Sequence, residues 1–452
     1  MPFTDPENRP SLFAILTLAL ALAGAASMTY YHLGLFMPLS QKANAARGLQ
    51  GRYSFGNDFY PIWLTSREWR RDPYSVEMTR EIQTGLFGRP LVPRHPGDPV
   101  SEYRTFAYPA FTDLLFWPVS KIPFAVSRAV LAPLLALLTL VSVVFWARAL
   151  SCRPGAIGMA ILILLTLGSY PVLEGLYAGQ LGLLVGFLLP ASLLAMQRGR
   201  LLLAGFLMAL TAMKPQMTVL AVFFLLLWTL QDWRRRRGFC IGLFGTLIPL
   251  VGAALLVWPH WIQDWLEVVL GYHRYARPPL VGEVLAEPLG PRAAMASLLM
   301  VLALVAVAML LAWRNRGATA ESQDFWRTLS LLLCITTVAL LPGQAIHDHV
   351  VLLPGIFLLV MSRQELSSSH ISKMLMYIGV AVTVWPWFAS FCLILLRPVF
   401  TDQQFYSKAI FALPLRTAAV FPFIVLGLLL LVGRSKTSLS GELPAAALSH
   451  NP

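Results

Sequence analysis

The chain has 452 residues, of which 57% are hydrophobic and only 13% are charged. Soluble globular proteins carry about 25% charged residues, so this composition excludes a soluble enzyme, a disordered protein and a nucleic-acid-binding protein. The formal net charge of +13 is explained by topology, because Lys and Arg gather in the cytoplasmic loops of membrane proteins. The sequence therefore predicts an all-α polytopic membrane protein.

Apolar stretches without Asp, Glu, Lys or Arg recur along the whole chain, and a helix that crosses the bilayer needs about 20 mostly apolar residues. When the shorter stretches are counted as well, the pattern predicts a bundle of about 12 transmembrane helices. The stretches are residues 11–41, 129–147, 154–173, 175–197, 201–213, 215–231, 238–263, 293–313, 328–346, 350–362, 374–396 and 417–433.

Two longer polar intervals, residues 38–123 and 259–291, interrupt the apolar pattern. We find no internal repeat, so residues 1–433 are predicted to form one membrane domain with two elaborated outer loops. Residues 434–452 form a polar tail that we predict to be cytoplasmic. The four cysteines have no CxxC spacing and predict neither a disulfide framework nor a metal site.

The orientation depends on residues 106–119, which either span the membrane or lie at its interface. The interfacial alternative places most basic residues of the short loops, including Arg234 to Arg237, on the cytoplasmic side. It also requires residues 201–231 to form two short spans that break at Lys214-Pro215, which a proline favours. We adopt this arrangement, with both termini cytoplasmic, and it brings the most unusual polar residues of the chain together on the outer face.

Asp58 follows the first span within Gly56-Asn57-Asp58-Phe59-Tyr60-Pro61. Its carboxylate either caps the aromatic helix that follows or serves as a general base that takes a proton from an acceptor hydroxyl. The aromatic segment 59–71 is predicted to lie flat on the outer leaflet, because Trp and Tyr favour the membrane interface. Residues 258–275 have the same pattern and predict a second surface helix.

Lys214 is the most exceptional cation, because a Lys at the hydrocarbon centre costs about 2.5–3.5 kcal/mol. It either contacts a lipid phosphate or snorkels to the headgroups. Arg104, in the first outer loop near Tyr108, has the same two alternatives. Gln180 begins a span at the same face, where it either hydrogen-bonds a sugar hydroxyl or caps its helix.

His347-Asp348-His349 follows a Pro-Gly turn at the outer face. The two histidines lack the i, i+4 spacing and the further ligands of a typical metal site, so we expect no metal. His347 and His349 either contact a phosphate or sugar, or belong to a solvated turn.

These residues, in this order, resemble glycosyltransferase family 87 of the GT-C superfamily, which includes polyprenyl-phosphate-mannose-dependent α-mannosyltransferases. The resemblance runs from about residue 56 to residue 360, and Tyr108-Pro109-Ala110 departs mildly from the usual Tyr-Pro-Pro. It rests on Asn57-Asp58-Phe59-Tyr60, Phe106-Ala107-Tyr108-Pro109-Ala110, Gly179-Gln180-Leu181-Gly182, Lys214-Pro215 and His347-Asp348-His349-Val350.

The resemblance implies a GT-C-like fold, a polyprenyl-phosphate sugar donor, an outer-face site and a catalytic acid at Asp58. The predicted partners are this donor, a lipid or glycan acceptor and the lipids of a bacterial-type plasma (inner) membrane, without any cofactor. Tyr108, Gln180, Lys214, His347, His349 and Arg104 would then face the donor phosphate or sugar. The alternative is a transporter or lipid flippase, which usually needs ionisable residues within its spans; only Glu174 comes close to that position.

Overall fold

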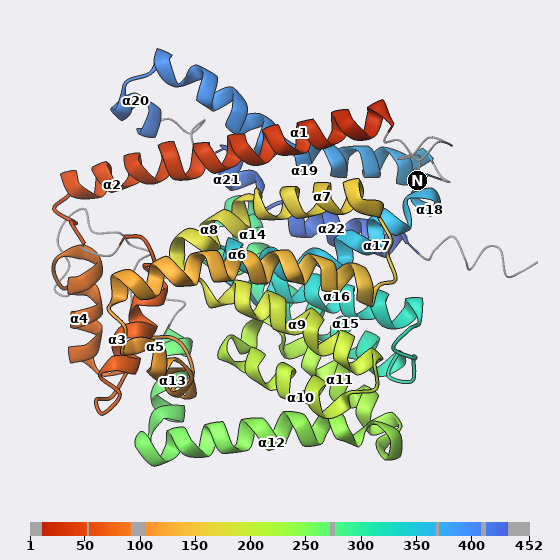
Figure 1. The fold of residues 1–452 in the computed structure, drawn as a ribbon, viewed down its shortest axis with the longest axis horizontal. Helices are drawn as coiled ribbons and strands as arrows, with labels where there is room; N and C mark the ends of the chain where they lie inside the picture. The colour runs from red at the N-terminus through yellow and green to blue at the C-terminus, as the bar shows by residue number, and fades with distance from the viewer. Residues whose placement is uncertain are drawn as a thin grey trace, which may run out of the picture.

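The computed structural model describes residues 11–51, 54–91, 105–271, 276–367, 370–407 and 413–432. Within these ranges the regular elements are helices, and the β-type contact is an isolated bridge between Pro279 and Pro342. Figure 1 shows long helices running side by side, with short helices gathered at one end. The predicted all-α class is confirmed.

The helices include short 3-10 and π segments, labelled η. Their bounds are α1 (Leu12–Thr29), η1 (Tyr30–Phe36), α2 (Met37–Ala46), α3 (Phe59–Arg67), α4 (Val76–Phe87), α5 (Phe111–Ser120), α6 (Phe124–Ala149), α7 (Gly155–Leu167), α8 (Tyr170–Ala178), α9 (Leu181–Gln197), α10 (Leu201–Leu210), η2 (Thr211–Met213), η3 (Pro215–Met217), α11 (Val219–Gln231), α12 (Trp233–Val257), α13 (Trp261–Gly271), α14 (Leu280–Leu289), η5 (Gly290–Arg292), α15 (Ala293–Arg314), α16 (Gln323–Ala339), η6 (Ile346–Leu352), α17 (Leu353–Met361), α18 (Arg363–Leu366), α19 (His370–Leu396), η7 (Arg397–Val399), α20 (Asp402–Ser407), α21 (Leu413–Thr417) and α22 (Phe421–Leu431).

Among the described residues, five helices are long and apolar enough to cross a membrane, and a pair bent by 56°, α7 with α8, would make a sixth. The remaining apolar helices are shorter, so the count of about 12 spans stays a prediction. The five are Leu12–Ala46, Phe124–Ala149, Trp233–Val257, Gly290–Arg314 and His370–Val399.

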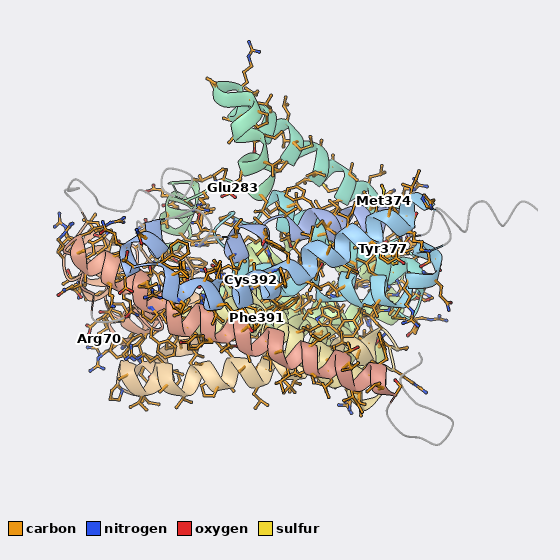
Figure 2. All side chains as sticks on the ribbon, turned by 90° about the horizontal axis from the view of Figure 1, so that it is seen from above. Arg70, Glu283, Met374, Tyr377, Phe391 and Cys392 are labelled. Atoms are coloured by element: carbon orange, nitrogen blue, oxygen red, sulfur yellow. The ribbon has the colours of Figure 1, made fainter. Side chains whose placement is uncertain are left out.

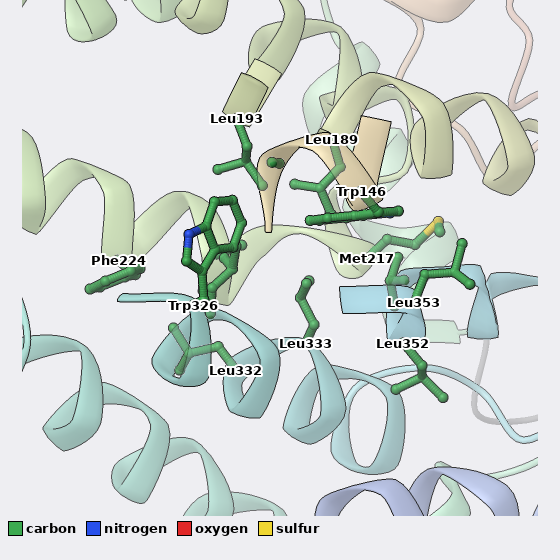
Figure 3. Close-up of a cluster of buried hydrophobic side chains, with 14 of the residues drawn as sticks. Trp146, Leu189, Leu193, Met217, Phe224, Trp326, Leu332, Leu333, Leu352 and Leu353 are labelled. Carbon is green, nitrogen blue, oxygen red and sulfur yellow. The ribbon is translucent and has the colours of Figure 1, made fainter. Parts of the chain in front are cut away.

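The core surrounds α9, which is apolar on every side and buried along most of its length, as expected of a helix in the middle of a bundle. α6 and α10 pack against it. Figure 3 shows Leu189 and Leu193 of α9 beside Trp146 of α6 and Trp326 of α16. The rings of Trp146 and Trp326 meet edge to face, with centroids 6.4 Å apart.

α6 separates the two ends of the bundle, which differ in charge. Its 26 residues span about 39 Å at 1.5 Å per residue. At its start, Phe124 packs on Phe59 of α3; we call this end the α3 end. At its finish, the side chain of Gln197 donates to the carbonyl of Ala149 over 2.9 Å. Arg234 to Arg237 lie in the first turns of α12 at this opposite end. Arg236 donates to the carbonyl of Trp228, whose Nε1 donates to the carbonyl of Ala318, and Gln197 also reaches Ala320.

The first polar interval folds into the bundle, contrary to the expectation that its aromatic segment lies flat on the membrane. Phe59 and Ile62 of α3 are fully buried, and Trp63 is 8% exposed. The reason is aromatic packing: these side chains find Phe116 and Phe124 on α5 and α6. α5 itself has ten residues, about 15 Å, which is half of the hydrocarbon thickness.

The second polar interval contains α13 and α14 and packs against the first. Trp258 Nε1 donates to the carbonyl of Arg71 over 2.9 Å, and Trp265 Nε1 donates to the carbonyl of Ala107 over 3.1 Å. The opposite side of α13 is open, with Leu270 71% exposed. The predicted amphipathic helix is therefore present, and its buried tryptophans attach it to the α3 end.

Large apolar side chains cover the outside of the long helices. In Figure 2, Met374, Tyr377 and Phe391 line the outside of α19, and each is about half exposed. α15 is the extreme case, with only 6% of its apolar window buried. Apolar surface on this scale is stable in lipid and not in water, which agrees with a membrane protein.

Candidate active site

Asp58 is held at the α3 end by the backbone of α8. Its N–H donates to the carbonyl of Ala178 over 3.0 Å, and the N–H of Gly56 donates to the carbonyl of Tyr177 over 2.8 Å. Asp58 occupies the N-cap position of α3, but its side chain makes no capping hydrogen bond. The carboxylate instead accepts a hydrogen bond from the side-chain amide of Gln180.

Glycine at position 179 makes this approach possible. Gly179 ends α8 in the left-handed conformation, with φ of +70°, which side chains rarely adopt. A Cβ there would lie 2.9 Å from Cβ of Phe59. The Gly179-Gln180 pair therefore brings α3 and α9 together and directs Gln180 at Asp58.

Gln180 joins two charged groups instead of capping α9. It occupies the N-cap position, yet its side chain makes no capping bond. Its Nε2 donates to Asp58, and its Oε1 accepts from Lys214 Nζ over 3.0 Å and from the Tyr108 hydroxyl over 3.5 Å. The side chain is buried, so these partners replace water.

Lys214 lies at the predicted break, between η2 and η3. It is 6% exposed, which excludes snorkelling. Its Nζ is 2.7 Å and 2.9 Å from the two carboxylate oxygens of Asp348 and also donates to Gln180. An ammonium has three protons, and these three acceptors can occupy all of them. Lys214 is thus the cation of a buried ion pair.

Asp348 is the member of the site that reasoning from sequence passed over in favour of its histidine neighbours. It is fully buried on η6, and a Cβ on Gly182 would lie 2.1 Å from its Oδ1. The second glycine of Gly179-Gln180-Leu181-Gly182 therefore makes room for the carboxylate. The signal was available, because a Lys in an apolar chain needs an anion, and Asp348 is an acid within another apolar segment.

His347 and His349 are both buried, which excludes the solvated turn. Nε2 of His347 lies 3.4 Å from Lys214 Nζ and 3.5 Å from Asp348 Oδ1. Nδ1 of His349 has no hydrogen-bond partner among the described residues. Arg104 lies outside the described residues. Within the described ranges, no group of three or more His, Cys, Asp or Glu side chains is placed to hold a metal ion.

A second pair of titratable side chains joins η1 to α8, with His32 buried and Glu174 partly exposed. His32 Nε2 is 3.0 Å from Glu174 Oε2, and the His32 ring meets Tyr170 and Tyr177 edge to face. His32 belongs to the π-helical segment η1, a geometry often associated with functional sites. The pair explains how an apolar segment accommodates Glu174.

Asp113 of α5 is a further buried acid that reasoning from sequence missed. Its Oδ1 accepts from Thr65 Oγ1 over 2.8 Å and from Ser66 Oγ over 3.2 Å. Burial raises the pKa of Asp113 well above its usual range, and the two hydrogen bonds offset part of this effect. The two hydrogen bonds attach α5 to α3, the helix that Asp58 precedes.

The comparison with protein families matches the model of glycosyltransferase family 87 to residues 106–342, just over half of the chain. The matched range includes Tyr108, Gln180 and Lys214, whereas Asp58 precedes it and His347 follows it. No curated protein and no solved structure matches the chain. The family match and the all-helical, apolar bundle agree with the sequence resemblance. The protein is a membrane glycosyltransferase and belongs to glycosyltransferase family 87.

Proposed function

We propose that the protein transfers a sugar, mannose by family resemblance, from a polyprenyl-phosphate donor to a lipid or glycan acceptor at the outer face of the plasma membrane. The observation that carries this proposal is the placement of Asp58. Its carboxylate lies at the α3 end, bound to a buried polar network and about 39 Å of helix away from Arg234 to Arg237 at the start of α12. The positive-inside rule favours the cytoplasm for this arginine cluster, which supports an outer-side position for Asp58 and the donor's headgroup.

The proposed reaction is a single displacement at the anomeric carbon. The Asp58 carboxylate accepts the proton of the acceptor hydroxyl, and the acceptor oxygen forms a bond to the anomeric carbon from the face opposite the phosphate. The bond between that carbon and the phosphate oxygen breaks, and its electron pair leaves with polyprenyl phosphate. The configuration at the anomeric carbon is inverted. A general base of this kind contributes about 10²–10⁴ in rate.

The leaving phosphate needs positive charge or hydrogen-bond donors near it. His347, next to the ion pair, is our main candidate for direct contact, and His349 is the second. Lys214 adds its charge, although the protons on its Nζ already have acceptors in Asp348 and Gln180. Direct contact between Lys214 and the phosphate stays a prediction, as do the sugar contacts of Tyr108 and Gln180 and the phosphate contact of Arg104.

The test measures release of polyprenyl phosphate by purified protein given polyprenyl-phosphate sugars, including mannose, with a lipid extract as the acceptor source. We expect release with one sugar and a loss of at least about 10² in rate for Asp58→Asn. Glu77→Gln, an exposed acid on α4, is the matched control and should keep the wild-type rate. Equal release by Asp58→Asn and wild type would remove Asp58 from the chemistry.

The family assignment favours transfer over the transporter or flippase that the sequence left open. The distinguishing experiment reconstitutes the protein in proteoliposomes and follows both solute or lipid flux and covalent sugar transfer. Flux without any transfer would reverse the proposal, while transfer without flux supports it.

A further inference from the structure

A continuous chain of hydrogen bonds runs from Asp348 to Asp58. Asp348 accepts from Lys214, Lys214 donates to Gln180, and Gln180 donates to Asp58. The four side chains come from four separate segments of the chain. All the links except Asp58 are buried: Gln180 is 6% exposed, Lys214 6% and Asp348 0%.

The chemistry of the central residues fixes the direction of every bond. A lysine ammonium can only donate, so the oxygen of the Gln180 amide must face Lys214. The Tyr108 hydroxyl lies on the same oxygen. The amide NH₂ group is consequently left to face Asp58, and an NH₂ group can only donate.

We propose that Asp348 and Lys214 are positioning residues that keep the Gln180 amide donating to Asp58 and thereby hold the base in its ionised form. The inference rests on the proposed role of Asp58 as the base and names the residues that set its protonation state. A donor favours the ionised form of a carboxylate, whereas a reversed amide would present its oxygen and favour the protonated form.

The ion pair is needed because a single buried charge would be unstable. A Lys without an anion in this position would lose its proton or leave the site, and the amide of Gln180 would lose its fixed direction. Asp348 provides the compensating charge, and Gly182 provides the space for it. The segment Gly179-Gln180-Leu181-Gly182 thus contains Gln180, which donates to Asp58, and Gly182, which leaves space for the Asp348 carboxylate.

Neighbouring polar side chains make contacts of their own. Tyr108 is bound to the oxygen of Gln180, and His347 lies beside the ion pair. The guanidinium of Arg128, on α6, donates to the carbonyl of Phe55 over 3.0 Å. Gln180 donates to the Asp58 carboxylate from its side-chain amide.

The test exchanges the two charges in the double variant Lys214→Asp/Asp348→Lys. The buried pair is retained, but a carboxylate now faces Gln180 and attracts its NH₂ group, so the amide turns its oxygen toward Asp58. The readout is an infrared pH titration of the protonated carboxyl band that Asp58→Asn removes, which needs no substrate. We expect the midpoint of this band to move up by about one pH unit.

Gln180→Met provides the second variant. It removes the donor to Asp58 and keeps both members of the ion pair, and Lys214 loses one of its three acceptors. It should raise the same midpoint in the same direction, and it decides the matter if the exchanged pair does not fold. The matched control is Arg71→Glu/Glu81→Arg, which reverses an exposed ion pair at the same end of the bundle and should leave the midpoint unchanged.

The activity assay separates this inference from the proposed function. With polyprenyl-phosphate mannose as the probe, the acid limb of the pH–rate profile should follow the infrared midpoint, with about a tenfold loss of rate one unit below the limb. An unchanged midpoint in folded Gln180→Met would overturn the inference, whatever the activity of Asp58→Asn. Full activity in Asp58→Asn would instead overturn the proposed function.

Discussion

Lys214 and Asp348 show how an apolar chain can retain two buried charges. Removing one member of such a pair typically costs about 3–5 kcal/mol, because the other charge is left uncompensated. The protein reduces that risk by giving Nζ three acceptors and by placing glycine at position 182, where Asp348 approaches α9. The lack of a side chain at position 182 therefore allows Asp348 to reach Lys214, and with it the geometry of the network from Asp348 to Asp58.

Gly182→Ala should displace Asp348 from Lys214, since the new Cβ would lie 2.1 Å from Oδ1. We expect a stability loss of at least about 2 kcal/mol and a large drop in activity, measured by thermal unfolding in detergent and by phosphate release. Gly245→Ala on α12 is the control, because open space surrounds that glycine. If the two variants unfold at the same temperature, the close approach of Asp348 to Gly182 does not contribute to stability.

At the scale of elements, the position of Asp58 depends on how α3 is held. Its apolar side packs against α5 and α6, its N-terminus is bonded to the end of α8, and the buried carboxyl of Asp113 ties it to α5. These contacts replace the flat surface helix that the aromatic pattern predicted. A helix fixed on three sides can present a base more precisely than one resting on lipid headgroups.

The pH dependence of stability should reveal Asp113. Burial raises its folded-state pKa well above the unfolded value, so its contribution to stability is fully present below the usual Asp pKa of about 3.9. That contribution is lost as the pH rises through the raised folded-state pKa. Asp113→Asn cannot ionise, and its oxygen can still accept from Thr65 and Ser66. The variant should therefore be more stable than wild type at neutral pH.

The measurement is the difference in melting temperature between Asp113→Asn and wild type at pH 7.5 and pH 4.5. We expect the difference to shrink as the pH is lowered, while Glu77→Gln shows no such trend. A difference that grows on acidification would mean that the folded protein stabilises the charged carboxylate.

At the scale of the whole molecule, the separation of the two ends is the feature that matters. Arg234 to Arg237 at the start of α12 lie at one end of α6, and the polar network lies at the other end. Figure 1 shows α3, α4 and α5 at the end of the bundle where α6 begins. This arrangement agrees with the convergence predicted from loop charges, and the membrane orientation that follows from it remains a prediction.

Cysteine labelling tests that orientation in a variant whose four native cysteines are replaced by alanine. Arg70→Cys, at the α3 end, should react in intact cells with a thiol reagent that cannot cross the membrane. Arg198→Cys, at the opposite end, should react only after permeabilisation. Both positions are exposed in the structure. The reverse pattern of labelling would place the Asp58 network in the cytoplasm.

The sequence by itself determined the class of protein and its family, and it predicted most members of the candidate site. The fraction of apolar residues indicates whether a chain folds in water or in lipid. A polar residue inside an apolar segment stands out in the sequence because burying it costs free energy. For this reason Asp58, Gln180, Lys214 and the segment around His347 could be selected without a structure.

Only the tertiary structure decided which of these side chains meet and in which direction each bond points. The contacts join residues 122 positions apart for Asp58 and Gln180, and 134 positions apart for Lys214 and Asp348. Asp348 could be selected from the sequence as a candidate anion for Lys214, but local patterns carry no information about which residues pair. For the same reason Asp113 was overlooked and α3 was predicted to lie at the membrane surface. Burial of α3 and pairing of Lys214 both depend on which helices become neighbours, and that is a property of the folded bundle.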